Sequence, residues 1–465
     1  MILSTLRTLA AGALALIVSA CGGGGGGDGG IGGTGGGGGA GATADVSVGA
    51  ITAIGSVWVN GVEFKSSTAT IKIDDNPHLE SDLRVGMVAR VDGSISGASA
   101  TTITVKSAIK GHVESVGTNQ MVVMGQTVVT DSGTAVSNGP IATGNYIEVH
   151  GQVVSDGRIA ATYIEKKATQ ATPPFAVKGF AKLHAAGGTT FVVGALNVSL
   201  GAGAITNDMP GGSWNGLLVE VKGTACAGNP VCSTLTASKV EPEGVQGNVS
   251  KVEIEGFVTA LTSTSDFTID SQRVVTTGST VFQGGLQSEI ALGGKLEVEG
   301  SLSGGILTAT KISFRENIRF EAPLDVKGSN SFTLTGLGGI TIEVNALTQY
   351  KNTSFAALSS GNYLRIRGRP GSGNNVIATE VEPQNGGNTS RVIMQAVASN
   401  VTRPNVTLLG IAINTTAMGS FMDINGNVIT ADQFFAVAAA GKLIKARGGL
   451  SGGVITWNQE IQLED

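Results

Sequence analysis

One phrase of eight residues recurs six times in this sequence and restricts what the chain can fold into. It begins with a glycine, continues with alternating apolar and polar residues, and ends with a second glycine seven positions later. Because side chains alternate across a pleated strand, each phrase predicts a strand with one buried face. A glycine at each end suits a turn with positive φ or a close backbone crossing. We interpret these residues as structural turn glycines: Gly86/Gly93, Gly144/Gly151, Gly216/Gly223, Gly293/Gly300, Gly361/Gly368 and Gly441/Gly448.

The sequence around each glycine pair repeats as well. An opening glycine precedes the pair by 37 residues in three repeats, as from Gly49 to Gly86, and by 33 residues in the second. Asn60-Gly61 lies between alternating apolar runs, a combination typical of a β-hairpin. An Ala-Thr-x-Ile phrase such as Ala100–Ile103 closes most repeats.

These features predict an all-β chain. We expect a tandem array of six small antiparallel β-barrels in which only neighbouring repeats touch. Repeats 1 to 6 are placed at residues 46–108, 109–167, 175–241, 252–316, 317–382 and 390–463. The segments 168–174, 242–248 and 383–388 are expected to be exposed linkers.

The N-terminus predicts export. Residues 1–20 combine Arg7, a short apolar run and small residues, a pattern typical of a secretory signal peptide. The sequence at 18–21, Val-Ser-Ala-Cys, resembles the bacterial lipobox, which implies lipidation of Cys21. The alternative is an ordinary signal peptide cleaved after Ala20, with Cys21 left free. In lipoproteins of that type, Gly22 after the cysteine favours the outer membrane over the inner one.

Residues 21–45 are expected to hold the lipidated cysteine and a disordered tether. The segment is almost entirely glycine, which cannot bury a core. It would span about 25–30 Å as a flexible coil.

Composition argues against nucleic acid as a partner. The chain has 30 Lys plus Arg against 35 Asp plus Glu, so no basic excess draws it to phosphates. Aromatic residues make up only 5%, which leaves few stacking platforms for bases.

The repeat resembles a family of bacterial lipoprotein modules known as domain of unknown function 5666. The likeness extends over nearly all of residues 46–463 and rests on the hairpin, the paired glycines and the Ala-Thr-x-Ile close. It implies a small barrel similar to oligonucleotide/oligosaccharide-binding folds on an exported protein. It implies no activity, because a fold alone does not define one.

Cys226 and Cys232 are the remaining cysteines, and five residues separate them. In an exported chain this spacing favours a local disulfide. A metal site is the alternative, but it would need two further ligands nearby, and the sequence indicates none.

Other candidate ligands occur singly. His112 and His150 fall in strands of repeat 2 that could be neighbours, so a two-histidine metal site competes with ordinary strand positions. His78 and His184 have no such partner. Asp74, Asp75, Glu80 and Asp82 form an acidic loop, for which a calcium site and a solvated loop are the alternatives. For a second loop at Asp423, a calcium site and a hairpin turn are the alternatives. No metal and no cofactor is expected.

No catalytic motif was found. No serine lies in a Gly-x-Ser-x-Gly elbow, and the histidines do not recur with the repeat. We therefore expect a non-enzymatic, structural, adhesive or scaffold lipoprotein of the outer membrane, facing the periplasm or the cell surface, with an envelope protein or glycan as partner. The alternative is a module that binds oligosaccharide or an extracellular polymer, and a glycan-acting enzyme is a third reading.

Overall fold

The computed structural model describes residues 44–464 except Ser132, 169–173, 229–230, Gly284, 316–317, 385–388 and Asn425. The predicted signal peptide, Cys21 and most of the tether lie outside these residues. Strands account for 59% of the structure, so the prediction of an all-β chain is confirmed. The described residues include one α-helix, α1 (Ala431–Val437), and the short 3₁₀ turns η1 (Glu80–Asp82), η2 (Gln287–Glu289) and η3 (Phe355–Ala357).

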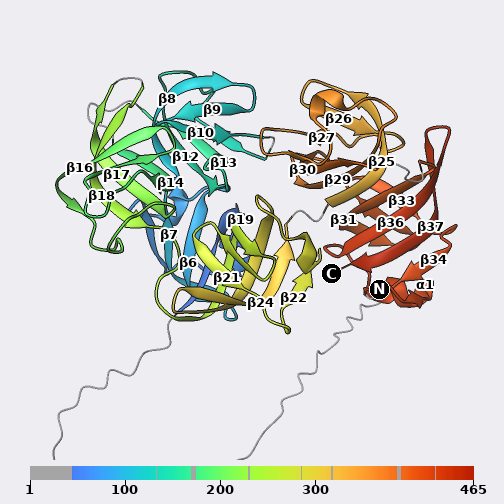
Figure 1. Cartoon of the computed structure of the whole chain (residues 1–465). Coiled ribbons are helices and arrows are strands. Elements are labelled where there is room, and N and C mark those ends of the chain that lie inside the picture. The colour runs from blue at the N-terminus through green and yellow to red at the C-terminus, as the bar shows by residue number, and fades with distance from the viewer. Residues whose placement is uncertain are drawn as a thin grey trace, which may run out of the picture. The chain divides into compact units, whose positions relative to one another are not determined.

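The strands join into three sheets, and each sheet combines strands of two repeats (Figure 1). The first has 13 strands from repeats 1 and 4: β1 (Asp45–Ala53), β2 (Val57–Val59), β3 (Val62–Phe64), β4 (Thr70–Ile73), β5 (Asn76–His78), β6 (Val88–Ser94), β7 (Ser99–Val105), β19 (Val249–Ser263), β20 (Asp266–Ile269), β21 (Gln272–Val275), β22 (Val281–Gln283), β23 (Lys295–Ser303) and β24 (Ile306–Phe314).

The second sheet has 11 strands from repeats 2 and 3: β8 (Ile109–Gly117), β9 (Gln120–Val123), β10 (Gln126–Val129), β11 (Ala135–Ser137), β12 (Tyr146–Val153), β13 (Ile159–Lys166), β14 (Phe175–Lys182), β15 (Thr190–Val193), β16 (Leu196–Ile205), β17 (Leu218–Ala227) and β18 (Thr234–Pro242).

The third sheet has 13 strands from repeats 5 and 6: β25 (Ile318–Lys327), β26 (Ser331–Leu334), β27 (Ile342–Glu343), β28 (Gln349–Tyr350), β29 (Tyr363–Pro370), β30 (Val376–Pro383), β31 (Arg391–Thr402), β32 (Asn405–Leu408), β33 (Ile411–Asn414), β34 (Ser420–Met422), β35 (Val428–Ile429), β36 (Leu443–Ser451) and β37 (Val454–Glu464).

The prediction of six separate small barrels is wrong. The chain forms a β-solenoid of about nine turns, and each sheet contains strands from two repeats. The cause lies in the opening strand of each repeat, which bonds to its own repeat and also offers backbone groups to another. β14 pairs with β15 and β17 of repeat 3, and its start also pairs with β8 of repeat 2. Such pairing satisfies backbone N–H and C=O groups that would otherwise form an open edge.

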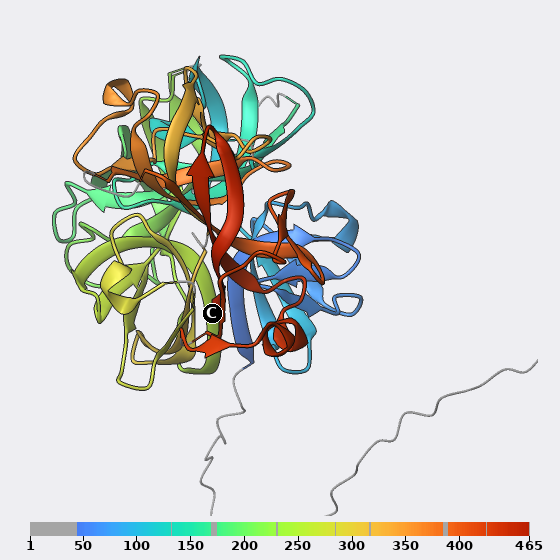
Figure 2. The ribbon, with the colours of Figure 1, turned by 90° about the vertical axis from the view of Figure 1, so that its right-hand side faces the viewer.

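Repeats 1 and 4 are joined although they are far apart in sequence. β1 runs parallel to β19, with Val46 opposite Val252 and Val48 opposite Ile254. Figure 2 shows the blue strands of repeat 1 beside the yellow-green strands of repeat 4. The prediction that only neighbouring repeats touch is therefore wrong.

The core follows this pairing for two of the three pairs of repeats, whereas repeats 1 and 4 have separate clusters, linked through Val46 and Val48 of β1. One hydrophobic cluster is shared by repeats 2 and 3, and another by repeats 5 and 6. In the second, Phe320, Phe332 and Phe434 are among the largest fully buried side chains. Shared clusters of this kind bury more apolar surface than one short repeat could bury alone.

The two glycines of each pair have different geometry. The first lies in a turn and has positive φ, as for Gly144 at 84°, where a side chain would be strained. The second does not lie in a turn, so its interpretation as a turn glycine is wrong. Gly151 stands within β12 at a register shift opposite β13, and a Cβ there would collide with the carbonyl oxygen of Ala160. The same holds for Gly93, Gly223, Gly300, Gly368 and Gly448, where a Cβ would meet a backbone oxygen of the facing strand.

The threonine of the closing phrase has a definite hydrogen bond. In repeat 1, Thr101 Oγ1 donates to the carbonyl oxygen of Asp92, the residue before the second glycine, over 2.8 Å. Repeats 2 to 4 make the equivalent bond from Thr162 to His150, Ser238 to Lys222 and Thr310 to Glu299. Thr379 of repeat 5 is the exception, since its hydroxyl is buried without a hydrogen-bond partner among the described residues.

Candidate functional site

The glycine-bounded strand carries a second pattern, which the sequence interpretation missed. Its fourth and sixth residues after the first glycine are ionisable and flank a core residue, as Glu220 and Lys222 flank the buried Val221. Because strand residues alternate between faces, both ionisable side chains point away from the core of their repeat. The same two positions are ionisable in all six glycine-bounded strands, and this was visible in the sequence: Arg90/Asp92, Glu148/His150, Glu220/Lys222, Glu297/Glu299, Arg365/Arg367 and Lys445/Arg447.

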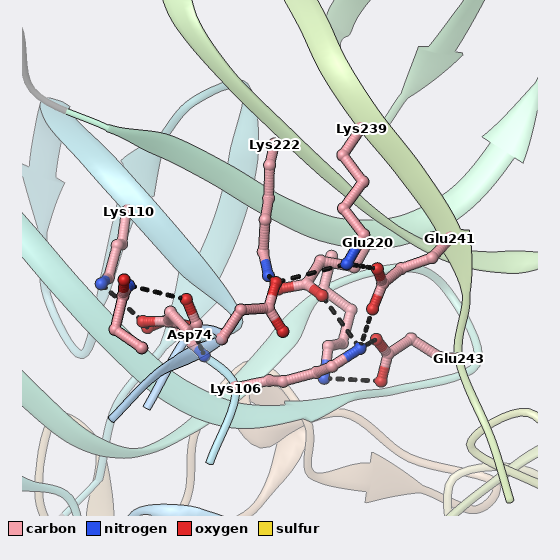
Figure 3. A network of polar contacts seen from close by, with 12 residues as sticks. Asp74, Lys106, Lys110, Glu220, Lys222, Lys239, Glu241 and Glu243 are labelled. Atoms are coloured by element: carbon pink, nitrogen blue, oxygen red, sulfur yellow. Dashed lines mark hydrogen bonds and ion pairs between the residues drawn. The ribbon is translucent and has the colours of Figure 1, made fainter. Parts of the chain in front are cut away.

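One of these pairs, Glu220 and Lys222 of repeat 3, forms ion pairs with Lys106 and Asp75 of repeat 1, and Lys110 of repeat 2 pairs with the neighbouring Asp74 (Figure 3). We call this cluster the ionic junction. It comprises Asp74, Asp75, Lys106, Lys110, Lys178, Glu220, Lys222, Lys239, Glu241 and Glu243. Four of its lysines stand in strands of repeats 2 and 3, and Lys106 directly follows β7.

Lys106 is at the centre of the junction. Its Nζ lies 3.0 Å from Oε2 of Glu220 and 3.2 Å from Oε1 of Glu243, and it also bonds to Glu241. Lys178 Nζ approaches Glu243 from the other side at 2.9 Å. A lysine ammonium has three donors, so Lys106 alone can bind Glu220, Glu241 and Glu243 together.

The acidic loop of repeat 1 contributes two carboxylates to the junction. Asp74 and Asp75 follow β4 with φ of 49° and 71°, and their side chains reach different repeats. Asp74 Oδ2 lies 2.5 Å from Nζ of Lys110, whereas Asp75 Oδ2 lies 2.6 Å from Nζ of Lys222. The loop therefore forms ion pairs between repeats, and its two leading carboxylates face lysines where calcium would need free oxygen ligands.

Burial and pairing shift the titration of these groups. Burial raises the pKa of Glu243, but Lys178 and Lys106 outweigh it and lower that pKa to about 2. Burial likewise opposes the ammonium of Lys106, yet Glu243 and Glu220 raise its pKa above the ordinary value. Lys178 is shifted upward for the same reason. Both shifts favour the ammonium form of Lys106 and Lys178, which is the form that binds carboxylates.

A cavity of about 190 Å³ adjoins the junction where repeats 1 to 4 meet. Lys106, Lys178 and Glu243 line it together with Asp270, which lies in the turn between β20 and β21. The Oδ1 atom of Asp270 is shielded from solvent and has no hydrogen-bond partner among the described residues. Burial raises the pKa of Asp270 to about 7, against the smaller opposing effect of Lys178. Glu220 of the junction is shifted in the same direction, because burial raises its pKa more than Lys106 and its other lysine partners lower it.

Cys226 and Cys232 are joined in a disulfide, with their Cα atoms 5.6 Å apart. The bond closes the loop between β17 and β18. Its neighbour Ala227 accepts a hydrogen bond from Ser233 N at 2.8 Å, which completes the turn.

The four histidines occupy separate environments. His150 is fully buried, with Nε2 2.8 Å from Oε1 of Glu148, whereas His112 stacks edge-on against Tyr146. His184 stacks flat on Trp214, with ring centroids 4.0 Å apart. The fourth, His78, bonds to Asp82 across one turn. Within the described residues, no group of three or more His, Cys, Asp or Glu side chains is placed to hold a metal ion.

In the part of the chain that the structure describes, no helix is both long enough and apolar enough to cross a bilayer.

Comparison with protein families identifies four of the six repeats. The family described as Domain of unknown function (DUF5666) matches residues 48–105, 110–165, 255–313 and 324–382, which correspond to repeats 1, 2, 4 and 5. The tandem repeat and its resemblance to this domain are therefore confirmed. A comparison with curated proteins finds no match for this chain.

Proposed function

We propose that this tandem array of DUF5666 domains is a non-catalytic scaffold of the bacterial envelope, anchored by lipid on Cys21 in the outer membrane. Its folded part would hold an envelope protein or glycan at the end of the glycine-rich tether. The folded part would lie in the periplasm or at the cell surface, on whichever side of the outer membrane this partner is found.

The ionic junction carries this proposal. Charged side chains of three repeats are bonded to one another, so their common role is to fix the repeats as one body. Lys106 is bonded to three carboxylates and Asp75 to two lysines. A rigid body with shared sheets is suited to presenting loops in a constant geometry.

The aromatic residues favour a scaffold over a polymer-binding module. If the repeats bound a polysaccharide along their length, we would expect an exposed aromatic side chain at the same position in each repeat. Instead Trp58 is partly exposed in repeat 1, Trp214 is buried against His184 in repeat 3, and Trp457 packs on the core cluster of repeats 5 and 6.

The anchor is tested by Cys21→Ser in the full chain expressed in its native type of envelope. Wild type should incorporate labelled fatty acid and fractionate with outer membranes, because two or more acyl chains bind a bilayer stably at roughly 0.8 kcal/mol per methylene. Cys21→Ser should lose the label and appear in the soluble fraction. A Cys21→Ser protein that stays in the outer membrane would contradict the lipid anchor.

The scaffold role is tested by cross-linking the anchored protein in cells and identifying what is attached. Recovery of a discrete protein or glycan bound to one repeat supports a scaffold. Turnover of an envelope glycan by the purified chain would refute the non-catalytic assignment.

A further inference from the structure

Repeat 5 and the opening strand of repeat 6 differ from the other repeats in the charge on their outward face. Five arginines stand on three adjacent strands, β25, β29 and β31, and the register places Arg319 directly opposite Arg367. Like charges directly opposed across an antiparallel pair are destabilising unless something compensates them. The five are Arg319, Arg365, Arg367, Arg369 and Arg391.

A cleft of about 280 Å³ opens over Arg319, Arg365 and Arg367, and η2 of repeat 4 forms its other wall. We call it the arginine cleft. Glu289 of η2 is paired with Arg367, and Gln349 donates to the carbonyl oxygen of Leu292 over 2.7 Å, so the two walls are bonded to each other. The side chains that matter here are Glu289, Arg319, Lys351, Arg365, Arg367 and Thr379.

The acids in and behind the cleft are already paired. Glu380 lies 2.6 Å from Lys351, and Glu382 lies 3.4 Å from Arg365. Glu321 lies behind the cleft, bonded to Arg319 and Arg365, and 3.4 Å from Arg391. The bases Arg319, Lys351, Arg365, Arg367 and Arg391 number five and the acids Glu289, Glu321, Glu380 and Glu382 four, so one positive charge is left over.

Two donors buried in the wall of the cleft have no acceptor among the residues that the structure describes. Arg319 uses Nη2 for Glu321, while its Nε is buried without a hydrogen-bond partner among the described residues. The hydroxyl of Thr379 is in the same state, although its counterparts in repeats 1 to 4 bond to a backbone oxygen. An unsatisfied buried donor costs about 1–3 kcal/mol, so two in one cleft call for an acceptor.

We propose that the arginine cleft binds an oxyanion, with Arg319 Nε and Thr379 Oγ1 as donors to its oxygens. An oxyanion supplies acceptors for both donors and neutralises the surplus positive charge, and guanidinium groups suit the flat geometry of carboxylate and the oxygens of phosphate. Its source is a carboxylate on an acidic sugar or a phosphate group. This site does not depend on the scaffold role, and its failure would leave the Cys21→Ser result unaffected.

The test measures binding of inorganic phosphate and of D-glucuronate to the full chain in detergent by titration calorimetry. Sodium chloride at matched ionic strength serves as the blank. We expect saturable binding of at least one probe at one site. The tighter probe identifies the source of the oxyanion. Absence of saturable binding of both probes at millimolar concentration would overturn the proposal.

Two variants and one matched control locate the site. Thr379→Val and Arg319→Lys should each weaken binding about tenfold, since each removes one donor to a charged acceptor. Thr310→Val makes the same change in repeat 4, where the hydroxyl bonds to Glu299, and should leave the affinity unchanged.

Thermal melting separates this site from a structural role. Thr310→Val should lower the melting temperature, because it loses a hydrogen bond, whereas Thr379→Val should not, because its hydroxyl has none to lose. If Thr379→Val lowers the melting temperature as much as Thr310→Val and leaves affinity unchanged, the oxyanion site at Thr379 is excluded.

Discussion

Replacing Lys106 by methionine removes the central charge of the ionic junction while keeping a side chain of similar length. Three carboxylates then lose their common partner, and Glu220 among them has a side chain with no exposed surface. Breaking a buried ion pair from one side typically costs about 3–5 kcal/mol, because the remaining charge stays buried. Lys106 is 23% exposed, and Glu241 and Glu243 keep Lys239 and Lys178, so we expect the lower end of this range, about 3 kcal/mol.

The cost should appear locally. Hydrogen exchange of the full chain under native conditions measures the opening free energy of individual strands, which suits a protein that need not unfold in one step. For Lys106→Met we expect faster exchange in β7, β17 and β18 and little change in β36 and β37 of repeat 6. High salt should alter the loss only slightly, since buried pairs are weakly screened.

Lys251→Met is the matched control. The Nζ of Lys251 lies 3.9 Å from Glu253 and its side chain is 42% exposed, so removing it should cost no more than about 0.5 kcal/mol. Equal losses for Lys106→Met and Lys251→Met would refute the view that the junction holds the repeats together.

Two further predictions concern the cavity and the glycines. Because burial raises the pKa of Asp270 to about 7, the folded state binds a proton that the unfolded state releases near pH 4, so stability from this group is lost as pH rises from about 4 to 7. Asp270→Asn should therefore raise the melting temperature at pH 8 and have no effect at pH 4; an equal effect at both values would contradict the buried carboxyl. Gly223→Val places side-chain atoms against the carbonyl oxygen of Thr236 and should destabilise repeat 3 by about 3 kcal/mol or more, measured by hydrogen exchange in β17. Unchanged protection of β17 would show that the strands can separate at this point without cost.

Local structure was predictable because it depends on short-range chemistry. Asn60 and Gly61 take up the positive φ values that a tight hairpin needs, and β2 pairs with β3 as the pattern indicates. The first glycine of each pair has the left-handed conformation that glycine tolerates. The disulfide between Cys226 and Cys232 is present in the structure, and its close spacing made it visible in the sequence.

The long-range pairing was not predictable from the same patterns. The alternation of apolar residues predicts which face of β1 is buried. It does not predict which strand pairs with β1, because backbone hydrogen bonds do not depend on the side chains. The pairing of Val46 with Val252 could therefore not be predicted from the sequence around either residue. The segment after Pro242 was predicted to be an exposed linker from its Pro and Gly content, yet Glu243 is held in the junction and Val245 is buried.

The candidate site was missed for a related reason. Ionisable residues on a strand face away from the core normally indicate solvent, and single sequences do not show that three such faces meet. Lys106 and Glu243 are separated by more than two repeats, and only the fold brings them together. The available signal was the recurrence of ionisable residues at fixed positions in the glycine-bounded strand, as at Glu220 and Lys222.

The parallel pairing of β1 with β19 also limits how such a chain can change over generations. Tandem genes readily gain or lose whole units by recombination, and a protein whose units touch only their neighbours tolerates this. Here, loss of the first unit would strip the partner from Val252, Glu253 and Ile254 and leave a bare strand edge in the fourth. We therefore expect a variant that lacks the first unit to lose order in β19 of the fourth unit as well.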